Sequence, residues 1–312
     1  MDIKNAISKD LSIPEQFIDE AIKVARIHVK IFNIPAKSGG QREIFHPSKK
    51  LKTIQYWLIH NVFNKMYVHE SSMAYKKETS TLLNASKHKD NRFFLRIDLE
   101  KFFPSISFQD LHPYLKDWHS TSKPRWDLDS DAMDLIRNVC FYKDDKLAIG
   151  YPCSPVISNI VMANFDKEVV QLVSKEQYGK AVYTRYADDM VFSTNVPNAC
   201  QAIKKEIFDL IRNNASPQIA VNFSKTKTGS STGGSASVTG LKILTGGNIT
   251  IHKEQKNHIR LLLSLFKKGV LAKEDEKKLI GHLSYIQHVA PDFYSKMQNK
   301  YFKEIYELRK TK

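Results

Sequence analysis

Hydrophobic residues recur at two different spacings along the chain, and each spacing predicts one kind of element. From 18 to 29, apolar positions return every three or four residues, which predicts an amphipathic helix; Ser12 and Glu15, just before it, have capping-box spacing. The same helical interval occurs in 51–66, 131–140 and 198–213. Short aromatic and β-branched runs predict strands at 92–98 and 182–193. We therefore expect an α+β fold.

Paired glycines predict two tight turns between strand-like runs. Gly39 and Gly40 predict a hairpin over 36–45, and because this segment carries Lys37 and Arg42 we expect a basic flap over an anionic ligand. Gly246-Gly247-Asn248 predicts a second hairpin near the end of the mixed region. We place a domain boundary there, with residues 1–244 as a mixed core and residues 245–312 as a basic, mostly helical body.

The composition indicates a nucleic-acid partner. The 312 residues include 48 Lys and Arg against 33 Asp and Glu, a formal net charge of +15, which repels itself unless a polyanion is bound. Residues 245–312 contribute 14 basic and 7 acidic positions. No apolar run approaches the roughly 18 to 20 residues that cross a bilayer, and no secretory pattern begins the chain, so we expect a cytoplasmic protein without a membrane partner. Three scattered cysteines exclude a disulfide framework.

Three carboxylates carry the candidate chemistry. Asp188 and Asp189 lie side by side between two strand-like runs, so they should occupy a hairpin tip. Asp is common in turns for local reasons alone. Asp98 follows another apolar strand, however, and three acids at neighbouring strand ends would hold two Mg²⁺ ions, which prefer oxygen ligands. Two such ions support in-line phosphoryl displacement, so the pattern predicts nucleotidyl transfer.

These residues resemble the motifs of reverse transcriptases. The resemblance covers nearly the whole chain, in the order in which the family carries its motifs: REIFHPS at 42–48, Asp98-Leu99 followed by Phe102-Phe103, GYPCSPVISNIVMANFD at 150–166, YADD at 186–189 and VNFSKT at 221–226. Two short elements are similar to signatures of the retron branch: Asn84-Ala85-Ser86-Lys87-His88 fits NAxxH, and Val238-Thr239-Gly240 fits VTG. The resemblance implies a right-hand fold of fingers, palm and helical thumb.

The resemblance also implies roles for single residues. Asp98, Asp188 and Asp189 would bind the metal ions with help from the Leu99 carbonyl, and Phe103 would exclude a 2′-hydroxyl as a steric gate. The implied nucleotide or primer contacts are Arg42, Phe103, Gly150, Tyr186 and Lys225. The implied RNA-binding positions are Asn84, His88, Val238, Thr239 and Gly240, since Thr and His side chains can hydrogen-bond 2′-hydroxyls.

Two segments depart from the family pattern. In the first, Ala148 stands where a proline is usual. Ile149 stands where a glutamine is usual, which removes a polar contact to the incoming nucleotide. Glu78 stands where a glycine is usual, which places a negative charge in a segment expected near the template. Neither change touches the carboxylates, so we retain the catalytic prediction.

The implied function is RNA-directed DNA synthesis of the retron type. Part of a cognate structured non-coding RNA would be copied into single-stranded DNA that stays joined to it through a branch (msDNA), with deoxynucleoside triphosphates as substrates and two Mg²⁺ ions as cofactors. Host RNase H would remove the template, and an effector (toxin) protein of the same operon would be a further partner in antiphage defence. Two alternatives stay open: another defence-associated prokaryotic reverse transcriptase, and a non-catalytic RNA-binding scaffold.

Overall fold

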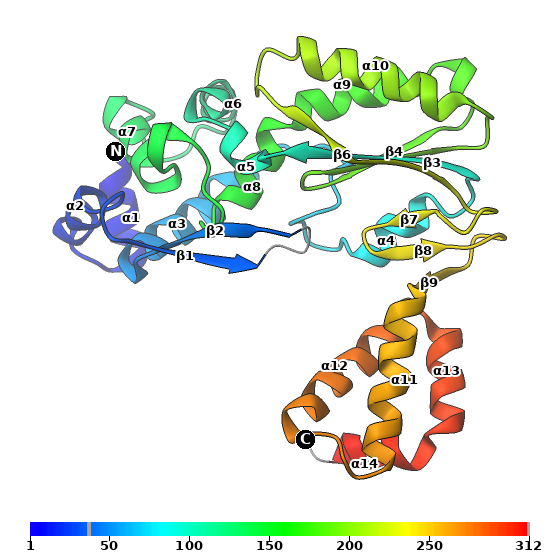
Figure 1. The fold of residues 1–312 in the computed structure, drawn as a ribbon. Coiled ribbons are helices and arrows are strands. Elements are labelled where there is room, and N and C mark those ends of the chain that lie inside the picture. Colours follow the sequence, from blue (N-terminus) through cyan, green and yellow to red (C-terminus); the bar gives the residue numbers. More distant parts are fainter. Residues whose placement is uncertain (36–38, 311–312) are drawn as a thin grey trace.

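The computed structural model describes residues 1–35 and 39–310, and it consists of a large mixed body and a smaller helical body (Figure 1). A long hydrophobic core joins the elements of the large body. A separate cluster begins at Ala85, Phe94 and Val191 and continues through the C-terminal helices. The two bodies follow each other along the chain, connected by β9 (Ile249–Ile251) and α11 (Lys253–Lys267).

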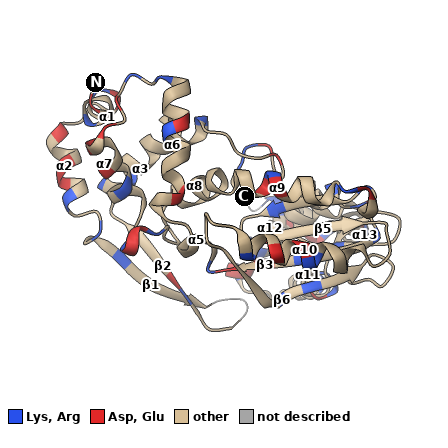
Figure 2. Ribbon diagram, turned by 90° about the horizontal axis from the view of Figure 1, so that it is seen from above, with Lys and Arg blue, Asp and Glu red and all other residues tan. Residues whose placement is uncertain are grey.

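The N-terminal part of the large body is helical, apart from one exposed hairpin. Its elements are α1 (Ile3–Leu11), α2 (Glu15–Lys23), β1 (Val29–Pro35), β2 (Gln41–Pro47), α3 (Lys49–Asn61), η1 (Phe63–Lys65) and α4 (Thr81–Lys87). Strands β1 and β2 pair antiparallel around Gly39 and Gly40, which both have positive φ, so the predicted hairpin is present. Its strands carry charges of both signs (Figure 2).

The first predicted helix differs from the observed structure at both ends. A separate helix, α1, precedes it, and Ser12 is the left-handed residue that ends α1. Pro14 is the N-cap of α2 and makes no side-chain capping bond, so the predicted capping box is wrong. Helix α2 stops at Lys23, and Val29 starts β1. The apolar periodicity continued across this boundary because Val29 packs against the same core as α2.

A four-stranded antiparallel sheet in the order β4-β5-β3-β6 forms the middle of the large body. Its strands are β3 (Phe93–Glu100), β4 (Val182–Tyr186), β5 (Asp189–Thr194) and β6 (Ala220–Ser230). Helices α9 (Ala163–Val173) and α10 (Ala199–Asn213) cover one face, and α4 lies on the opposite side of the sheet (Figure 1). The remaining elements of this body are α5 (Phe102–Ser105), α6 (Phe108–Ser122), α7 (Ser130–Cys140), η2 (Lys143–Asp145), α8 (Ser154–Val161) and η3 (Glu176–Tyr178). The expected α+β class is confirmed.

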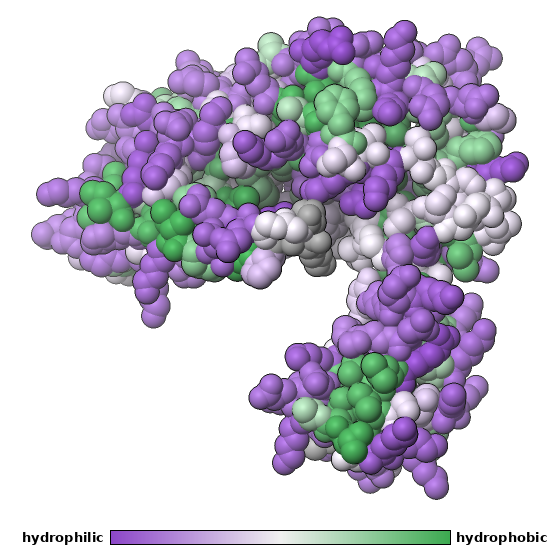
Figure 3. All heavy atoms as spheres, in the orientation of Figure 1, coloured by the Kyte–Doolittle hydropathy of each residue, from purple (hydrophilic) through white to green (hydrophobic). Residues whose placement is uncertain are grey.

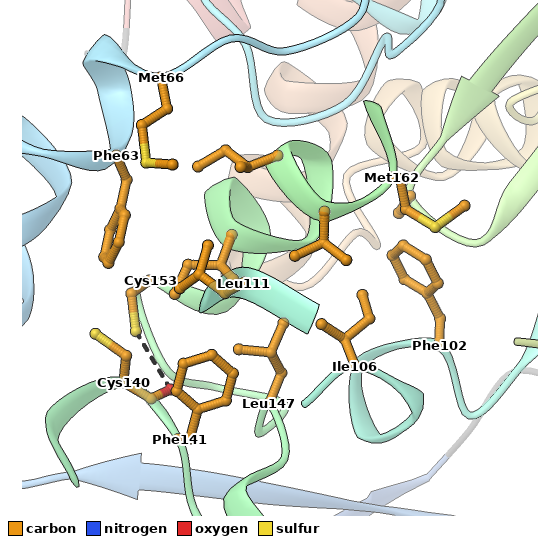
Figure 4. Close-up of a cluster of buried hydrophobic side chains, with 14 of the residues drawn as sticks. Phe63, Met66, Phe102, Ile106, Leu111, Cys140, Phe141, Leu147, Cys153 and Met162 are labelled. Atoms are coloured by element: carbon orange, nitrogen blue, oxygen red, sulfur yellow. Dashed lines mark hydrogen bonds between the residues drawn. The ribbon is translucent and has the colours of Figure 1, made fainter. Parts of the chain in front are cut away.

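Aromatic and aliphatic side chains from distant segments fill the core beside this sheet (Figure 4). Phe141 packs edge-on against Phe108 with ring centroids 5.6 Å apart, and Leu147 lies next to them. Cys140 and Cys153 are free and buried, and the Cys153 thiol lies 3.7 Å from the Cys140 carbonyl oxygen. These two cysteines therefore act as packing residues.

A small three-stranded sheet and four helices complete the chain. They are β7 (Ser237–Val238), β8 (Leu241–Ile243), β9, α11, α12 (Lys273–Val289), α13 (Pro291–Lys300) and α14 (Phe302–Lys310). Strands β8 and β9 pair across Gly246 and Gly247, both with positive φ, as the second glycine pair predicted. The helical body shows a hydrophobic patch between polar surfaces (Figure 3). None of the helices within the described residues is long and apolar enough to span a membrane.

Candidate active site

Strand register brings the three predicted carboxylates together. Asp98 of β3 stands directly opposite Asp189, the first residue of β5, and Asp188 lies in the turn between β4 and β5. The turn is tied to β3 because the Leu99 N–H donates to the Asp188 carbonyl oxygen over 2.9 Å. Ala187 closes the turn with a left-handed φ of 58°. The YADD segment therefore occupies a hairpin tip, as expected from the sequence.

Two cationic side chains neutralise these carboxylates. Arg96 Nε donates to Asp189 Oδ1 over 2.6 Å, and Lys225 Nζ lies 3.1 Å from Asp98 Oδ1. Burial, more than the neighbouring Asp98, raises the pKa of Asp188. Burial also raises the pKa of Asp189 to about 6, although Arg96 opposes this shift. Two of the three carboxylates, Asp98 and Asp189, are thus paired with cations of the protein itself.

A cavity of about 570 Å³ opens beside the carboxylates. Residues from six separated segments line it, among them Arg42, Phe45, Tyr75, Asp98, Leu99, Phe103, Ile149, Asp188, Asn222 and Lys225. Arg42 and Lys225 give the cavity positive charge near the carboxylates, so it combines what a triphosphate and its counter-ions need. Lys37, which we also considered on the flap, lies outside the described residues.

The donor set fits magnesium. Asp98, Asp188 and Leu99 line the cavity and offer oxygen atoms, the ligands that Mg²⁺ prefers. No group of three or more His, Cys, Asp or Glu side chains within residues 1–35 and 39–310 is arranged to hold a metal ion. Asp189 is engaged with Arg96 instead. Three-carboxylate coordination therefore requires Asp189 to exchange its guanidinium partner for the metal.

Phe103, the residue expected to act as a steric gate, lines the cavity. It lies in α5 directly after β3, with its ring 6.4 Å from Tyr75 and 5.5 Å from Phe102. Phe102 is only 4% exposed and packs in the core. Phe102 also lines the cavity, but it is buried, so Phe103 is the more exposed of the two phenylalanines. Tyr186, the last residue of β4, is partly buried and packs against the large core beside the carboxylate turn.

Gly150 lies in close contact with β2. We expected its missing side chain to let the backbone approach the nucleotide. A Cβ atom here would lie 2.5 Å from the Phe45 carbonyl oxygen, so the glycine makes room for β2. The Phe45 N–H donates to the Ile149 carbonyl oxygen over 2.8 Å, which fixes the hairpin to this turn. Ile149 itself lines the cavity, with an alkyl group where the family usually has an amide.

The second departure from the family pattern sits in strained backbone. Glu78 has a φ of 62°, in the left-handed region where glycine is favoured. This backbone conformation explains why a glycine is usual at the position. Glu78 is exposed and is not among the cavity residues.

A buried polar network lies under the carboxylate turn, and the sequence reading missed it. Arg185 is fully buried and makes two bonds to Asp166 of α9, from Nε over 2.9 Å and from Nη2 over 2.7 Å. Its Nη1 also donates to the Ala187 carbonyl oxygen over 3.2 Å. The Tyr183 hydroxyl donates to Asp166 over 2.7 Å. Through Arg185 the network holds Ala187, the left-handed residue of the turn, in place. The only signal in the sequence is an arginine within an otherwise apolar strand.

The NAxxH and VTG segments meet each other in the structure. Helix α4 packs against all three strands of the small sheet, and the Thr239 hydroxyl donates to the Thr81 carbonyl oxygen over 3.2 Å. Gly240 is exposed beside it with a φ of 79°. Segments about 150 residues apart in sequence therefore form one structural unit.

Three of the five residues proposed to bind RNA are buried here. His88 is 0% exposed, and both ring nitrogens are hydrogen-bonded, Nδ1 to Ser193 and Nε2 to Thr184, each over 2.7 Å. Asn84 and Val238 are also 0% exposed. The expectation that the His88 side chain contacts RNA directly is therefore corrected, because both of its ring nitrogens are already bonded within the protein. His88 instead fixes α4 to the four-stranded sheet, called the palm sheet below. Both amide atoms of Asn84 lack a hydrogen-bond partner.

Comparison with known proteins identifies the family. The family model described as reverse transcriptase (RNA-dependent DNA polymerase) matches residues 34–282. The retron Ec73 reverse transcriptase of Escherichia coli is 40% identical over 278 residues, which cover 88% of each chain. This chain belongs to the retron reverse transcriptases. The retron Ec83 enzyme of the same species is 28% identical over 88% of this chain and 87% of its own, and the retron Ec86 enzyme is 26% identical over 98% and 92%.

The fold extends to more distant polymerases. A telomerase from Candida albicans, solved with a fragment of telomeric RNA, superimposes with a TM-score of 0.52 at 13% sequence identity. The match covers 92% of this chain but only 60% of the telomerase chain. At this identity the likeness concerns the fold alone, and it confirms the right-hand arrangement of the polymerase. This retron reverse transcriptase is accordingly an RNA-directed DNA polymerase.

Proposed function

We propose that this polymerase copies part of one cognate structured RNA into single-stranded DNA that stays joined to the RNA through a branch. The observation that carries the proposal is the cavity of about 570 Å³ that brings Asp98, Asp188, Arg42 and Phe103 together in a member of the retron family. The 40% identical relative is a retron reverse transcriptase, and the matched region covers most of both chains.

Two Mg²⁺ ions held by Asp98, Asp188, Asp189 and the Leu99 carbonyl would lower the pKa of the attacking hydroxyl and stabilise the leaving oxygen. Arg42 lines the same cavity and would hold the triphosphate through its planar guanidinium. Lys225 would release Asp98 and remain near the substrate phosphates. Phe103 would lie against the sugar and exclude the 2′-hydroxyl of a ribonucleotide. The side chains therefore divide between charge neutralisation and selection.

The cognate RNA is the main partner in this proposal. The formal charge of +15 suits a long polyanion, and Thr239 and the exposed Gly240 remain the accessible part of the VTG segment. His88 would support RNA recognition indirectly by fixing α4 to the four-stranded sheet, and Asn84 would do so through its buried place in α4, which packs against the small sheet. We also propose that host RNase H removes the copied template, that an effector protein of the same operon binds the complex in antiphage defence, and that the protein works in the cytoplasm.

The test is to purify the protein from its native operon and to analyse the nucleic acid that remains bound. A discrete DNA that is joined to RNA through a branch, and that disappears in an Asp188→Asn variant, is the expected result. RNA without any DNA, even with Mg²⁺ and deoxynucleotides supplied, would contradict the proposal and favour an RNA-binding scaffold. Unbranched DNA would contradict the retron mode and favour another defence-associated polymerase.

A further inference from the structure

Arg96 contacts one of the three active-site carboxylates without lining the cavity beside them. It lies two residues before Asp98 on β3, so the two side chains project from the same face of the sheet. Asp189 stands directly opposite Asp98, which places it diagonally across from Arg96. Lys225 is among the described residues that line the cavity, whereas Arg96 and Asp189 are not. Arg96 is therefore placed to act on Asp189 and not on a bound nucleotide.

The contact between Arg96 and Asp189 is one that another cation can replace. Arg96 Nε donates to Asp189 Oδ1 over 2.6 Å, and no second bond from this guanidinium to a carboxylate is present among the described residues. Arg185, by contrast, holds Asp166 with two nitrogen atoms inside the core. The Arg96 side chain is also 41% exposed, so it can return to water when it leaves Asp189. A single, partly exposed contact costs little to exchange, whereas a buried two-bond contact costs much.

Burial and a neighbouring charge favour the Arg96–Asp189 bond while no metal ion is bound. Asp189 is only 8% exposed, and a carboxylate buried to that extent needs a counter-charge. Lys227 stands directly opposite Arg96 on β6, and like charges in that register repel, which favours the guanidinium on the side of β5. A divalent ion at Asp98 and Asp188 would reverse this balance, because it attracts the Asp189 carboxylate and repels the guanidinium.

We propose that Arg96 is a positioning residue that competes with metal ions for Asp189. In the free polymerase the guanidinium occupies this carboxylate in place of a metal ion. Asp189 joins Asp98 and Asp188 only when a nucleotide and its ions enter the cavity and displace Arg96. The complete metal site is therefore assembled on substrate binding and is not held ready beforehand. The inference rests on the proposed function, since it concerns the metal site of the same polymerase.

The first test measures metal binding without nucleic acid or nucleotide. Mn²⁺ is the probe, because electron paramagnetic resonance measures the free ion directly. Arg96→Gln removes the competing charge, so it should bind Mn²⁺ at least about fivefold more tightly than the wild type. Arg96→Lys keeps the charge and should bind Mn²⁺ as weakly as the wild type. Arg92→Gln is the matched control and should change nothing, because this exposed arginine lies about 20 Å from Asp98, at roughly 3.3 Å per residue along the strand.

Two further results separate competition from a merely structural role of Arg96. The added affinity of Arg96→Gln should disappear when Asp189→Asn is combined with it, because the gain comes from the freed carboxylate. Mn²⁺ should raise the melting temperature of Arg96→Gln more than that of the wild type, because the ion replaces the missing counter-charge. Unchanged or weaker Mn²⁺ binding by folded Arg96→Gln, or a gain that survives Asp189→Asn, would overturn the inference.

A last measurement follows the wild-type side chain itself. In protein with isotope-labelled arginine, the NMR signal of the Arg96 Nε–H is identified by its loss in Arg96→Lys, and the bond to Asp189 should slow its exchange with water. Mg²⁺, a primed template and a non-hydrolysable deoxynucleoside triphosphate should together restore fast exchange. Slow exchange that persists in this complex would overturn the inference. A wild-type protein that incorporates no deoxynucleotide at any Mg²⁺ concentration would instead contradict the proposed function.

Discussion

The two faces of the palm sheet hold aspartate–cation pairs of opposite character. Under α9, Asp166 and Arg185 have side chains that are both 0% exposed. On the other face, Arg96 beside Asp189 is 41% exposed, and Lys225 beside Asp98 is 39% exposed. The buried pair cannot be exchanged without leaving a charge in the core, whereas the cations of the open pairs can move into solvent. Solvent access to the cation thus separates structural aspartates from those that can bind metal.

The largest test of this comparison is Asp188→Asn on the open face. Loss of a metal-binding carboxylate removes several kcal/mol of transition-state stabilisation, so DNA synthesis should fall by at least about a thousandfold. RNA binding and thermal stability should stay close to the wild type because the side chain lies at a cavity wall. Primer extension with Mg²⁺ measures DNA synthesis, and filter binding measures RNA binding. Residual synthesis within tenfold of the wild type would contradict the metal assignment.

On the face covered by α9, removal of a charge should lower the stability of the fold. Asp166→Asn leaves the Arg185 guanidinium buried without its counter-charge, which should lower the free energy of unfolding by about 3 to 5 kcal/mol. Asp209→Asn is the matched control, because Asp209 pairs with Arg212 at the surface and its loss should cost at most about 0.5 kcal/mol. Urea denaturation without nucleic acid measures both. Equal costs would show that burial does not distinguish these pairs.

Phe103→Ala tests selection on the open face without removing a charge. The smaller side chain should admit a 2′-hydroxyl, so discrimination against ribonucleotides should fall by roughly 10- to 100-fold, the range expected for steric contacts in a pocket. The measurement is the ratio of kcat/KM for a deoxynucleotide to that for the matching ribonucleotide. Phe141→Leu, a change in a fully buried core residue that is not among the cavity residues, should leave the ratio unchanged. An unchanged ratio for Phe103→Ala would remove the gate from this residue.

The last effect concerns His88 and pH, and it is small only near neutral pH. Burial lowers the pKa of His88 from its ordinary value of 6.5 to about 3, so the folded protein keeps this ring neutral while the unfolded chain takes up a proton. Its contribution to stability is complete above pH 6.5 and decreases as the pH falls toward 3, by up to about 1.4 kcal/mol per pH unit. His88→Gln should flatten this dependence, and the exposed His60→Gln should not. If the free energy of unfolding of His88→Gln and of the wild type changed with pH in the same way, His88 would not be the source of this pH dependence.

What the sequence could predict depended on local geometry. Asp98 and Asp189 lie opposite each other because they belong to two short strands, β3 and β5, whose boundaries were clear in the sequence. The glycine pairs specified both hairpins. The Arg185–Asp166 pair was not predictable, since nothing local distinguishes it from surface charges until α9 is placed over β4. The burial of His88 escaped for the same reason: its two partners lie about 100 residues away, on adjacent strands.

The role of Gly150 shows a different limit. The motif indicated correctly that no side chain is tolerated there, but only the structure identifies what occupies the space. A pattern of residues records that a close approach exists without naming the approaching group. The functional assignment therefore had to wait until β2 was placed.

The contact between Gly150 and β2 also couples the position of β2 to that of the turn at Ile149 and Gly150. Because the Phe45 N–H is bonded to the Ile149 carbonyl and the two backbones touch at Gly150, a displacement of β2 must either break that bond or carry the turn with it. Arg42 is on the same strand, and Ile149 forms part of the cavity wall. If Arg42 binds the substrate phosphates, as proposed, a displacement of β2 on binding would also move the cavity wall at Ile149, so substrate binding and pocket shape would be coupled.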